Sequence, residues 1–181
     1  MKKTTEGVFQ LEEDFSVLEA HMIKTLIDES IVSNKRRARI NFHPNERSNC
    51  QEMIICLQND AKLPIHYHEN KSESFHVIKG TLGIVLLDEG FDKNADFIIL
   101  NREVGPVYYR LNSSKAHLVV GLSDYVIFHE VTEGPYIGKP PKMPKWSIGK
   151  EDEVESLRVK LRNEFIERSN RSHLANELKN H

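Results

Sequence analysis

A chain of 181 residues is long enough for one sizeable hydrophobic core and too short for two. Its net charge of −2, with no long block of basic residues, argues against nucleic acid as the main partner. Two cysteines are too few for a disulfide framework, and no window approaches the roughly 18 apolar residues of a membrane span, so we expect a cytoplasmic protein with free thiols.

The first predicted element is an amphipathic helix over residues 12–29. Four apolar residues recur there at helical spacing: Phe15, Leu18, Met22 and Leu26. We therefore expect residues 1–34 to form an N-terminal helical segment whose apolar face packs on a larger body. The opening residues, MKKTTEGVFQ, contain no apolar run, so a secretory signal is not expected.

From residue 38 to about 134 the pattern changes to short runs rich in Ile, Val, Phe and Tyr, separated by Gly, Asn, Asp and Ser. The runs are ARINF, EMIICLQ, LPIHYH, SFHVIKG, TLGIVLLD, DFIILN, PVYYRL, AHLVVGL and YVIFHEV. Short strands without helices between them predict a sandwich or barrel, which we place at residues 35–148, and argue against a parallel α/β sheet. DEGFDKNAD and LNSSKAH are predicted to be hairpin turns.

The end of the chain predicts an extended segment followed by a helix. PYIGKPPKMPKW is rich in proline and is expected to run over the surface of the barrel. Residues 149–181 are predicted to form a charged amphipathic helix, which could dock on the barrel, pair with a second subunit or remain in solvent. The apolar stripe of this helix consists of Val154, Leu157, Leu161 and Phe165, with Val159 and Ile166 off the stripe.

One short stretch, HYHENKSESFHVIKG, carries the clearest chemistry. His66 and His68 are two residues apart, so in a strand they point to the same face. A turn after them would bring Glu73 back on the neighbouring strand. Two imidazoles and a carboxylate suit one divalent first-row metal such as Fe, Mn, Ni or Zn. His117, which begins the run HLVVGL, is the best candidate for a fourth ligand.

Three further positions are candidates for substrate binding. Arg37 and Arg39 share one face of their strand, and guanidinium groups bind carboxylate or phosphate in a bidentate manner. Ordinary surface ion pairs are the alternative role for them. Tyr109 is the third candidate, although the sequence leaves open whether Tyr109 or Tyr108 faces inward. His76 lies an odd number of residues from the metal-site carboxylate and should face away from it.

The spacing His66-x-His68-x4-Glu73-x6-Gly80 resembles the first cupin motif, and His117 matches the histidine of the second. KRRARINFH, HLVVGLSD, FHEVTEGPY and PKW together resemble the WbuC family of cupin-fold metalloproteins over most of residues 35–147. The resemblance implies a mainly β, cupin-type double-stranded β-helix, a jelly-roll barrel, to which the chain adds an N-terminal and a C-terminal helix. It also implies a homodimer.

The function implied by this resemblance is that of a metal-binding cupin acting on a sugar nucleotide or related carbohydrate in lipopolysaccharide O-antigen biosynthesis. Within such a site, Glu73 would be a ligand and could also accept a proton. Three alternatives stay open: an Fe-dependent dioxygenase- or isomerase-type cupin acting on a small organic acid, a non-catalytic metal- or ligand-binding protein, and a metal-free epimerase. The carboxylate at the ligand position argues against the last of these.

Overall fold

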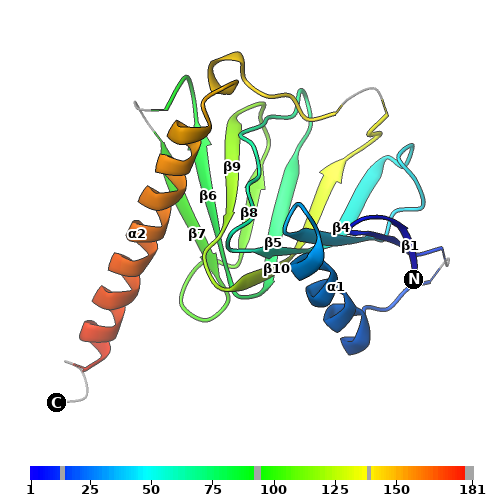
Figure 1. The fold of residues 1–181 in the computed structure, drawn as a ribbon, viewed down its shortest axis with the longest axis horizontal. Coiled ribbons are helices and arrows are strands. Elements are labelled where there is room, and N and C mark those ends of the chain that lie inside the picture. Colours follow the sequence, from blue (N-terminus) through cyan, green and yellow to red (C-terminus); the bar gives the residue numbers. More distant parts are fainter. Residues whose placement is uncertain (13–14, 92–94, 138–139, 178–181) are drawn as a thin grey trace.

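The computed structural model describes residues 1–12, 15–91, 95–137 and 140–177, with side chains of the final helix described as far as residue 167. Two β-sheets face each other, and one helix covers the outer side of each sheet (Figure 1). Helix α1 spans Ala20–Val32, α2 spans Glu151–Glu177, and a short 3-10 helix spans Lys145–Ser147. The layers are therefore helix, sheet, sheet and helix.

The strands of both sheets are antiparallel, except that β2 and β3 run parallel. The larger sheet consists, in spatial order, of β1 (Lys2–Thr5), β2 (Val8–Gln10), β3 (Arg37–Asn41), β4 (Cys50–Gln58), β10 (Tyr125–Glu133), β5 (Glu73–Lys79) and β8 (Tyr108–Leu111). The smaller sheet consists of β7 (Asp96–Asn101), β6 (Thr81–Leu87) and β9 (Ala116–Gly121).

The strand order is that of a jelly roll. The segment between β4 and β5 joins the smaller sheet through an antiparallel bridge between His66 and His117. With this segment counted as the second of eight strands that begin at β4 and end at β10, one face has the order 1-8-3-6 and the other 2-7-4-5. Cupins share this double-sheet arrangement with lectin and capsid domains. The predicted mainly β jelly-roll barrel with one helix toward each end of the chain is confirmed.

Alternation along the strands sorts the apolar side chains into three layers. The layer between the sheets includes Phe75, Ile84 and Phe128. A second layer lies between the larger sheet and α1 and contains Leu26. A third lies between the smaller sheet and α2 and contains Leu161. Because β6 has a covered face on both sides, nearly every one of its residues is buried.

The N-terminal segment differs from its prediction. Strands β1 and β2 precede the helix and extend the larger sheet, and α1 begins at Ala20 rather than at residue 12. The chain is still bound to the sheet at Leu11, whose N–H donates to Asn41 O at 3.1 Å, so the helix cannot begin before the chain has turned back. Phe15, which was expected on the apolar face of the helix, is 79% exposed.

Helix α2 docks on the smaller sheet along the predicted stripe. Leu157 and Leu161 are buried, whereas Val159 and Ile166 are exposed. The buried guanidinium of Arg158 donates to backbone carbonyls in the loop that precedes the His66 segment, one of them Ala61 O at 3.3 Å. Charge-assisted bonds of this kind are stronger than neutral ones. The helix is thereby anchored to the loop that leads into the histidine pair.

Two connections differ from or extend the sequence interpretation. DEGFDKNAD joins the antiparallel pair β6 and β7, as a hairpin does, although residues 92–94 lie outside the described residues. LNSSKAH is not a hairpin turn, because β8 and β9 belong to different sheets and the chain crosses between them. The proline-rich segment runs along the histidine segment and forms a bridge between Lys142 and Tyr67.

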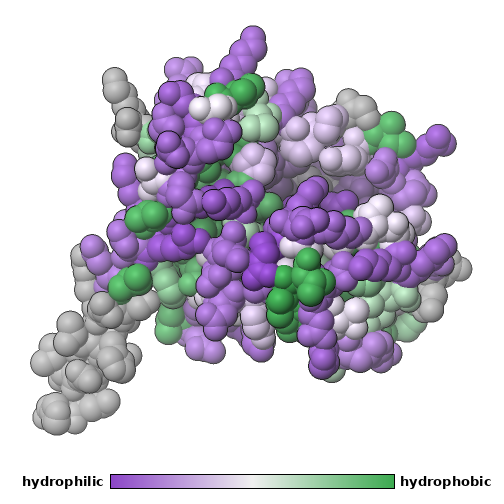
Figure 2. Space-filling view, viewed as in Figure 1, coloured by the Kyte–Doolittle hydropathy of each residue, from purple (hydrophilic) through white to green (hydrophobic). Residues whose placement is uncertain are grey.

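The surface shows no single large apolar region in the view of Figure 2, where the molecule is mainly hydrophilic and hydrophobic side chains form small separate groups. Exposed apolar side chains on the two helices include Ile31, Val32 and Val159. Scattered groups of this size are ordinary on a folded domain. Among the described residues, neither helix combines the length and hydropathy that crossing a bilayer requires.

Candidate metal centre

The four predicted ligands meet between the two sheets. His66 and His68 come from the segment at the edge of the smaller sheet, Glu73 is the first residue of β5, and His117 is the second residue of β9. One ligand atom from each lies within 4.8 Å of the others. Glu73 Oε1 is 3.1 Å from His117 Nε2, and Glu73 Oε2 is 3.2 Å from His68 Nε2. We call these four residues the metal cradle.

Local geometry explains why the motif has this spacing. His66 is fixed by reciprocal backbone bonds to His117, from N to O at 3.0 Å and from O to N at 2.8 Å. Two residues further, His68 returns to the same face. Gly80 follows β5 with φ of +81°, where the chain passes from one sheet to the other, and a Cβ there would lie 2.5 Å from Tyr125 O. The glycine of the motif is therefore required by the backbone.

Two buried atoms of the cradle lack hydrogen-bond partners among the described residues, namely Glu73 Oε1 and His117 Nε2. They are only 3.1 Å apart, close enough for an ion pair, but they form no hydrogen bond of satisfactory geometry, so both remain available to a ligand in the space between them. Buried polar atoms are costly without partners. A divalent cation in that space would satisfy both, so these four residues could hold a metal.

Backbone carbonyls select the nitrogen that each of two histidines offers. His66 Nδ1 lies 3.2 Å from Pro64 O, and His117 Nδ1 lies 3.2 Å from Lys115 O. A carbonyl oxygen only accepts, so Nδ1 carries the hydrogen and the neutral ring presents the lone pair of Nε2 to the cradle. This arrangement is the usual second interaction of metal-binding histidines.

In the metal-free cradle the pKa shifts favour an ionised Glu73, a neutral His66 and a His117 that binds a proton more readily than a free imidazole. Burial, together with the neighbouring His117, lowers the pKa of His66 to about 4. Burial acts to raise the pKa of Glu73, but the imidazoles of His117 and His68 outweigh it and hold that pKa below its ordinary value. For His117, burial acts to lower the pKa, and the carboxylate of Glu73 outweighs it and raises the pKa.

These shifts predict how the metal-free protein responds to acid. His66 is neutral in the folded state down to about pH 4, whereas in the unfolded chain it takes up a proton below about 6.5, so the unfolded state binds more protons in this range. We expect the free energy of unfolding to fall by on the order of 3 kcal/mol from this residue as the pH falls from about 6.5 to about 4.

Chelator-treated protein unfolded in urea at several pH values would measure this fall. His66→Gln should reduce the pH dependence, whereas His76→Gln, at an exposed position, should keep it. An equal slope in wild type and His66→Gln would contradict the assignment of this slope to His66.

Three of the cradle residues, His66, His68 and Glu73, line a partly enclosed cavity of about 390 Å³. Arg37 and Arg39 line its wall, because they alternate on β3 with Ala38 and Ile40, which face α1. Asn41, the next residue on the same face, also lines the cavity. The shared face predicted for the two arginines thus opens into the same space as the metal cradle.

The remaining sequence candidates are divided between the two faces of their strands. Tyr109 turns inward and stacks on Phe75 with ring centroids 5.6 Å apart, but it is not among the described residues that line the cavity. Burial raises the pKa of Tyr109, and the charge of Glu73 adds to the effect. Tyr108 and His76 are exposed on the outer face.

Glu130 is a cavity residue that the sequence analysis missed. It lies on β10, which pairs with β4 and β5 in the larger sheet, and it is half-buried between the inward-facing Phe128 and Thr132. Burial and then the charge of Glu73 raise the pKa of Glu130 to about 7, against the opposite effect of Arg37 and Arg39. A charged residue on the inward face of a strand such as YVIFHEVTE was the available signal, since buried acids mark functional sites.

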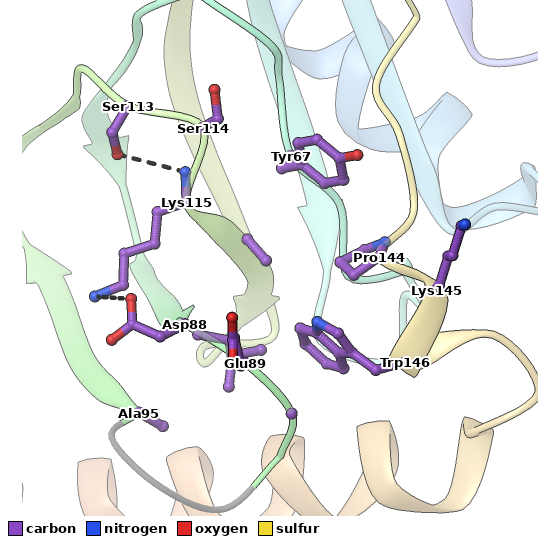
Figure 3. Close-up of a pocket in the computed structure, with 13 residues that line it drawn as sticks. Tyr67, Asp88, Glu89, Ala95, Ser113, Ser114, Lys115, Pro144, Lys145 and Trp146 are labelled. Carbon is purple, nitrogen blue, oxygen red and sulfur yellow. Dashed lines mark hydrogen bonds and ion pairs between the residues drawn. The ribbon is translucent and has the colours of Figure 1, made fainter.

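A larger and more open hollow of about 1150 Å³ lies on the outer side of the smaller sheet (Figure 3). Tyr67 lines it, since it alternates with the two histidines and points away from the cradle. Trp146 lies on the same side of the hollow as Tyr67, and Lys115 pairs with Asp88 at 3.0 Å on the side that faces them. Because these charges are already paired and the hollow is open, the smaller cavity is the better candidate for chemistry despite its size.

Comparisons with known proteins identify a domain but not an activity. A family model described as a domain of unknown function (DUF6016) matches residues 18–98, which is less than half of the chain. These residues contain His66, His68 and Glu73 but not His117. A comparison with curated proteins gave no match.

Several solved structures resemble the fold at low sequence identity. A crystal structure described as that of the DMSP lyases RdDddP and RnDddQII has a TM-score of 0.46 and 16% identity, covering 61% of this chain and 53% of that chain. The cupin domain of Schizosaccharomyces pombe Cnp3 has a TM-score of 0.44 and 9% identity, covering 55% of this chain and 66% of that chain. A Bacillus subtilis oxalate decarboxylase described by its Mn(II) centres has a TM-score of 0.42 and 15% identity, covering 51% of this chain and 23% of that chain. With these low scores, the jelly-roll assignment rests on the strand order of this chain.

Proposed function

We propose that this chain is a metal-binding jelly-roll protein that holds an anionic small molecule beside one divalent first-row metal. The observation that carries the proposal is the metal cradle, in which Glu73 Oε1 and His117 Nε2 are buried, close and without hydrogen-bond partners among the described residues. Ordinary structural histidines are satisfied by protein groups. Here the two atoms are arranged for a shared ligand.

The cradle residues would have distinct roles. His66 and His117 would donate through Nε2, with their rings oriented by backbone carbonyls. Glu73 would supply the negative charge, and because neighbouring imidazoles hold its pKa below the ordinary value, it is better suited to bind the metal than to accept a proton from a bound ligand. A bound divalent metal would supply Lewis-acid chemistry there and would leave positions open for an oxygen ligand.

The two arginines would set the charge of the ligand. Arg37 and Arg39 line the same cavity as three of the cradle residues, and Arg39 Nε is buried without a hydrogen-bond partner among the described residues. Burial, followed by the charge of Arg39, lowers the pKa of Arg37, so an anion between the two would relieve their repulsion. Carboxylate and phosphate groups match the guanidinium fork.

The substrate class is the finer part of the proposal. The resemblance to the WbuC family supports a sugar nucleotide or related carbohydrate in O-antigen biosynthesis, with the arginines binding phosphate. The cavity volume of about 390 Å³ favours a second candidate, a small organic acid transformed by an oxygenase- or isomerase-type site. Both candidates use the same metal cradle and the same pair of arginines.

A thermal-shift comparison on metal-loaded protein tests the proposal and separates the two candidates. UDP-glucose, glucose 1-phosphate, succinate and uncharged glucose serve as probes, with an Arg37→Met/Arg39→Met variant as the control. At about 100 times Kd, an anionic ligand should raise the midpoint by about 5–10 °C, and the variant should lose the shift. Equal shifts with glucose, or in the double variant, would refute the anion assignment. Oxygen uptake with Fe(II) and succinate would favour the small-acid candidate.

A further inference from the structure

We propose that Asn41, Arg39 and Glu130 form a recognition subsite beside the metal cradle that takes a small hydroxylated anion, namely a monosaccharide-sized carboxylate or phosphate. This inference rests on the proposed function only in assuming that an anion enters the cavity. It adds the hydroxyl groups that the anion must carry and names two residues, Asn41 and Glu130, that would recognise them.

Asn41 presents an unsatisfied acceptor to the cavity. Gln10 Nε2 donates to the backbone oxygen of Leu11 at 3.1 Å and to that of His43. These two bonds use both hydrogens of the Gln10 amide. Gln10 Oε1 therefore accepts from Asn41 Nδ2 at 3.3 Å. Asn41 Oδ1 is left without a hydrogen-bond partner among the described residues, although Asn41 is only 7% exposed. A ligand hydroxyl would supply the missing donor.

Arg39 presents the opposite kind of group two residues earlier on the same strand face. Its Nε is a buried donor that has no acceptor among the described residues. A carboxylate or phosphate would accept from it and would also neutralise the charge. The wall of β3 thus offers one unsatisfied donor and one unsatisfied acceptor, which a ligand with both an anionic group and hydroxyl groups can satisfy together.

Glu130 lies in the same lateral row as Asn41. The register places Asn41 opposite Met53, and Met53 opposite Glu130, so all three side chains leave the sheet on its inner face. Met53 is apolar, and Glu130 is therefore the next polar group along the wall. A carboxyl group there can bind a second ligand hydroxyl, and Glu130 is paired with Phe75, two residues from Glu73 on β5, which places it toward the metal end.

The size of the cavity limits the ligand. A volume of about 390 Å³ lies near the lower end of the range of roughly 300–1,000 Å³ that is typical of small-molecule sites. A monosaccharide-sized acid or phosphate fits such a space, whereas a complete nucleoside diphosphate sugar would have to leave its nucleoside outside. The chemistry of the wall and the volume therefore agree on a short chain or ring that bears several hydroxyls and one anionic group.

Calorimetric titration of the metal-loaded full chain with gluconate and hexanoate tests the inference. Both probes are six-carbon carboxylates, and only gluconate carries hydroxyls; glucose 6-phosphate is included to distinguish phosphate from carboxylate. We expect gluconate or glucose 6-phosphate to bind at least about tenfold more tightly than hexanoate. Asn41→Leu and Glu130→Met should each weaken the hydroxylated probe by about tenfold and leave hexanoate unchanged.

Glu52→Gln is the matched control. Glu52 precedes Met53 on β4, so its side chain projects from the opposite face of the sheet. There its carboxylate contacts His129 at 2.9 Å, outside the cavity. The control should change neither affinity. Equal binding of gluconate and hexanoate by the wild type, no binding of either hydroxylated probe, or a parallel loss of all probes in the two variants would each overturn the inference.

Metal content measured on the same samples keeps the two proposals apart. Bound metal without discrimination between the probes would reject the subsite and leave the metal proposal standing. Hydroxyl-dependent binding in protein that takes up no metal would support the subsite and reject the metal proposal. Because the variants replace buried polar groups by apolar groups of similar size, we expect them to fold, and retained metal and hexanoate binding would verify it.

Discussion

Replacement of His66 and His68 by alanine is expected to abolish metal binding. The double variant removes two of the four groups whose ligand atoms lie within 4.8 Å of one another. Loss of a single outer partner of a metal ligand already costs about 10–100-fold in affinity, so loss of two direct ligands should exceed about 100-fold. Competition with a metal-sensitive dye, using Zn(II) and Mn(II) separately, would measure the change.

His76→Ala provides the control for this prediction. His76 lies on β5 with Glu73, but its side chain is exposed on the outer face. It should therefore bind metal as the wild type does. Unchanged affinity in the double variant, or an equal loss in His76→Ala, would show that the strand faces have been assigned incorrectly.

Replacement of Phe75 by alanine is expected to destabilise the protein by about 3–5 kcal/mol, because it leaves a large cavity between the sheets. Phe75 is 2% exposed, and its ring lies 5.6 Å from that of Tyr109 and 5.3 Å from that of Phe128. Phe75 also lines the cavity, because it lies two residues after Glu73 on the same inward face of β5. Urea unfolding of the chelator-treated protein would measure the loss.

Tyr108→Ala is the matched aromatic control for this stability prediction. Tyr108 is adjacent to Tyr109 on β8 but is 54% exposed, so its removal should change the free energy of unfolding by no more than about 0.5 kcal/mol. A loss below about 1 kcal/mol for Phe75→Ala would mean that the space between the sheets collapses easily or that the ring is not part of the core.

The metal cradle was predictable because its geometry is mostly local. Two-residue alternation places His66 and His68 on one face, and the turn after them returns Glu73. The choice between Tyr108 and Tyr109 depends instead on the register between β8 and β5, which no local pattern determines. Long-range register likewise aligns Glu130 on β10 with the cavity wall; an acid within an apolar run marks the position as unusual, but the run alone does not show what the acid faces.

The N-terminal region shows another limit of sequence patterns. β1 is exposed along its whole length, so it carries no alternation that could distinguish a strand from a loop. Leu18, Met22 and Leu26 do pack on the layer under the larger sheet, although Leu18 precedes α1, whereas Phe15 is exposed and does not belong to that face. Pairing of β2 with β3 keeps the chain extended as far as Gln10, and a capping box between Glu19 and Met22 marks the start of α1.

The most direct measurement for the central claim is elemental analysis by mass spectrometry of untagged wild-type protein purified without a nickel column. We expect close to one first-row transition metal per chain, or uptake of one after incubation with Fe(II), Mn(II) or Zn(II), and release on chelation. Protein that contains no metal and takes up none under these conditions would contradict the account, because Glu73 Oε1 and His117 Nε2 would then have to be satisfied by another ligand.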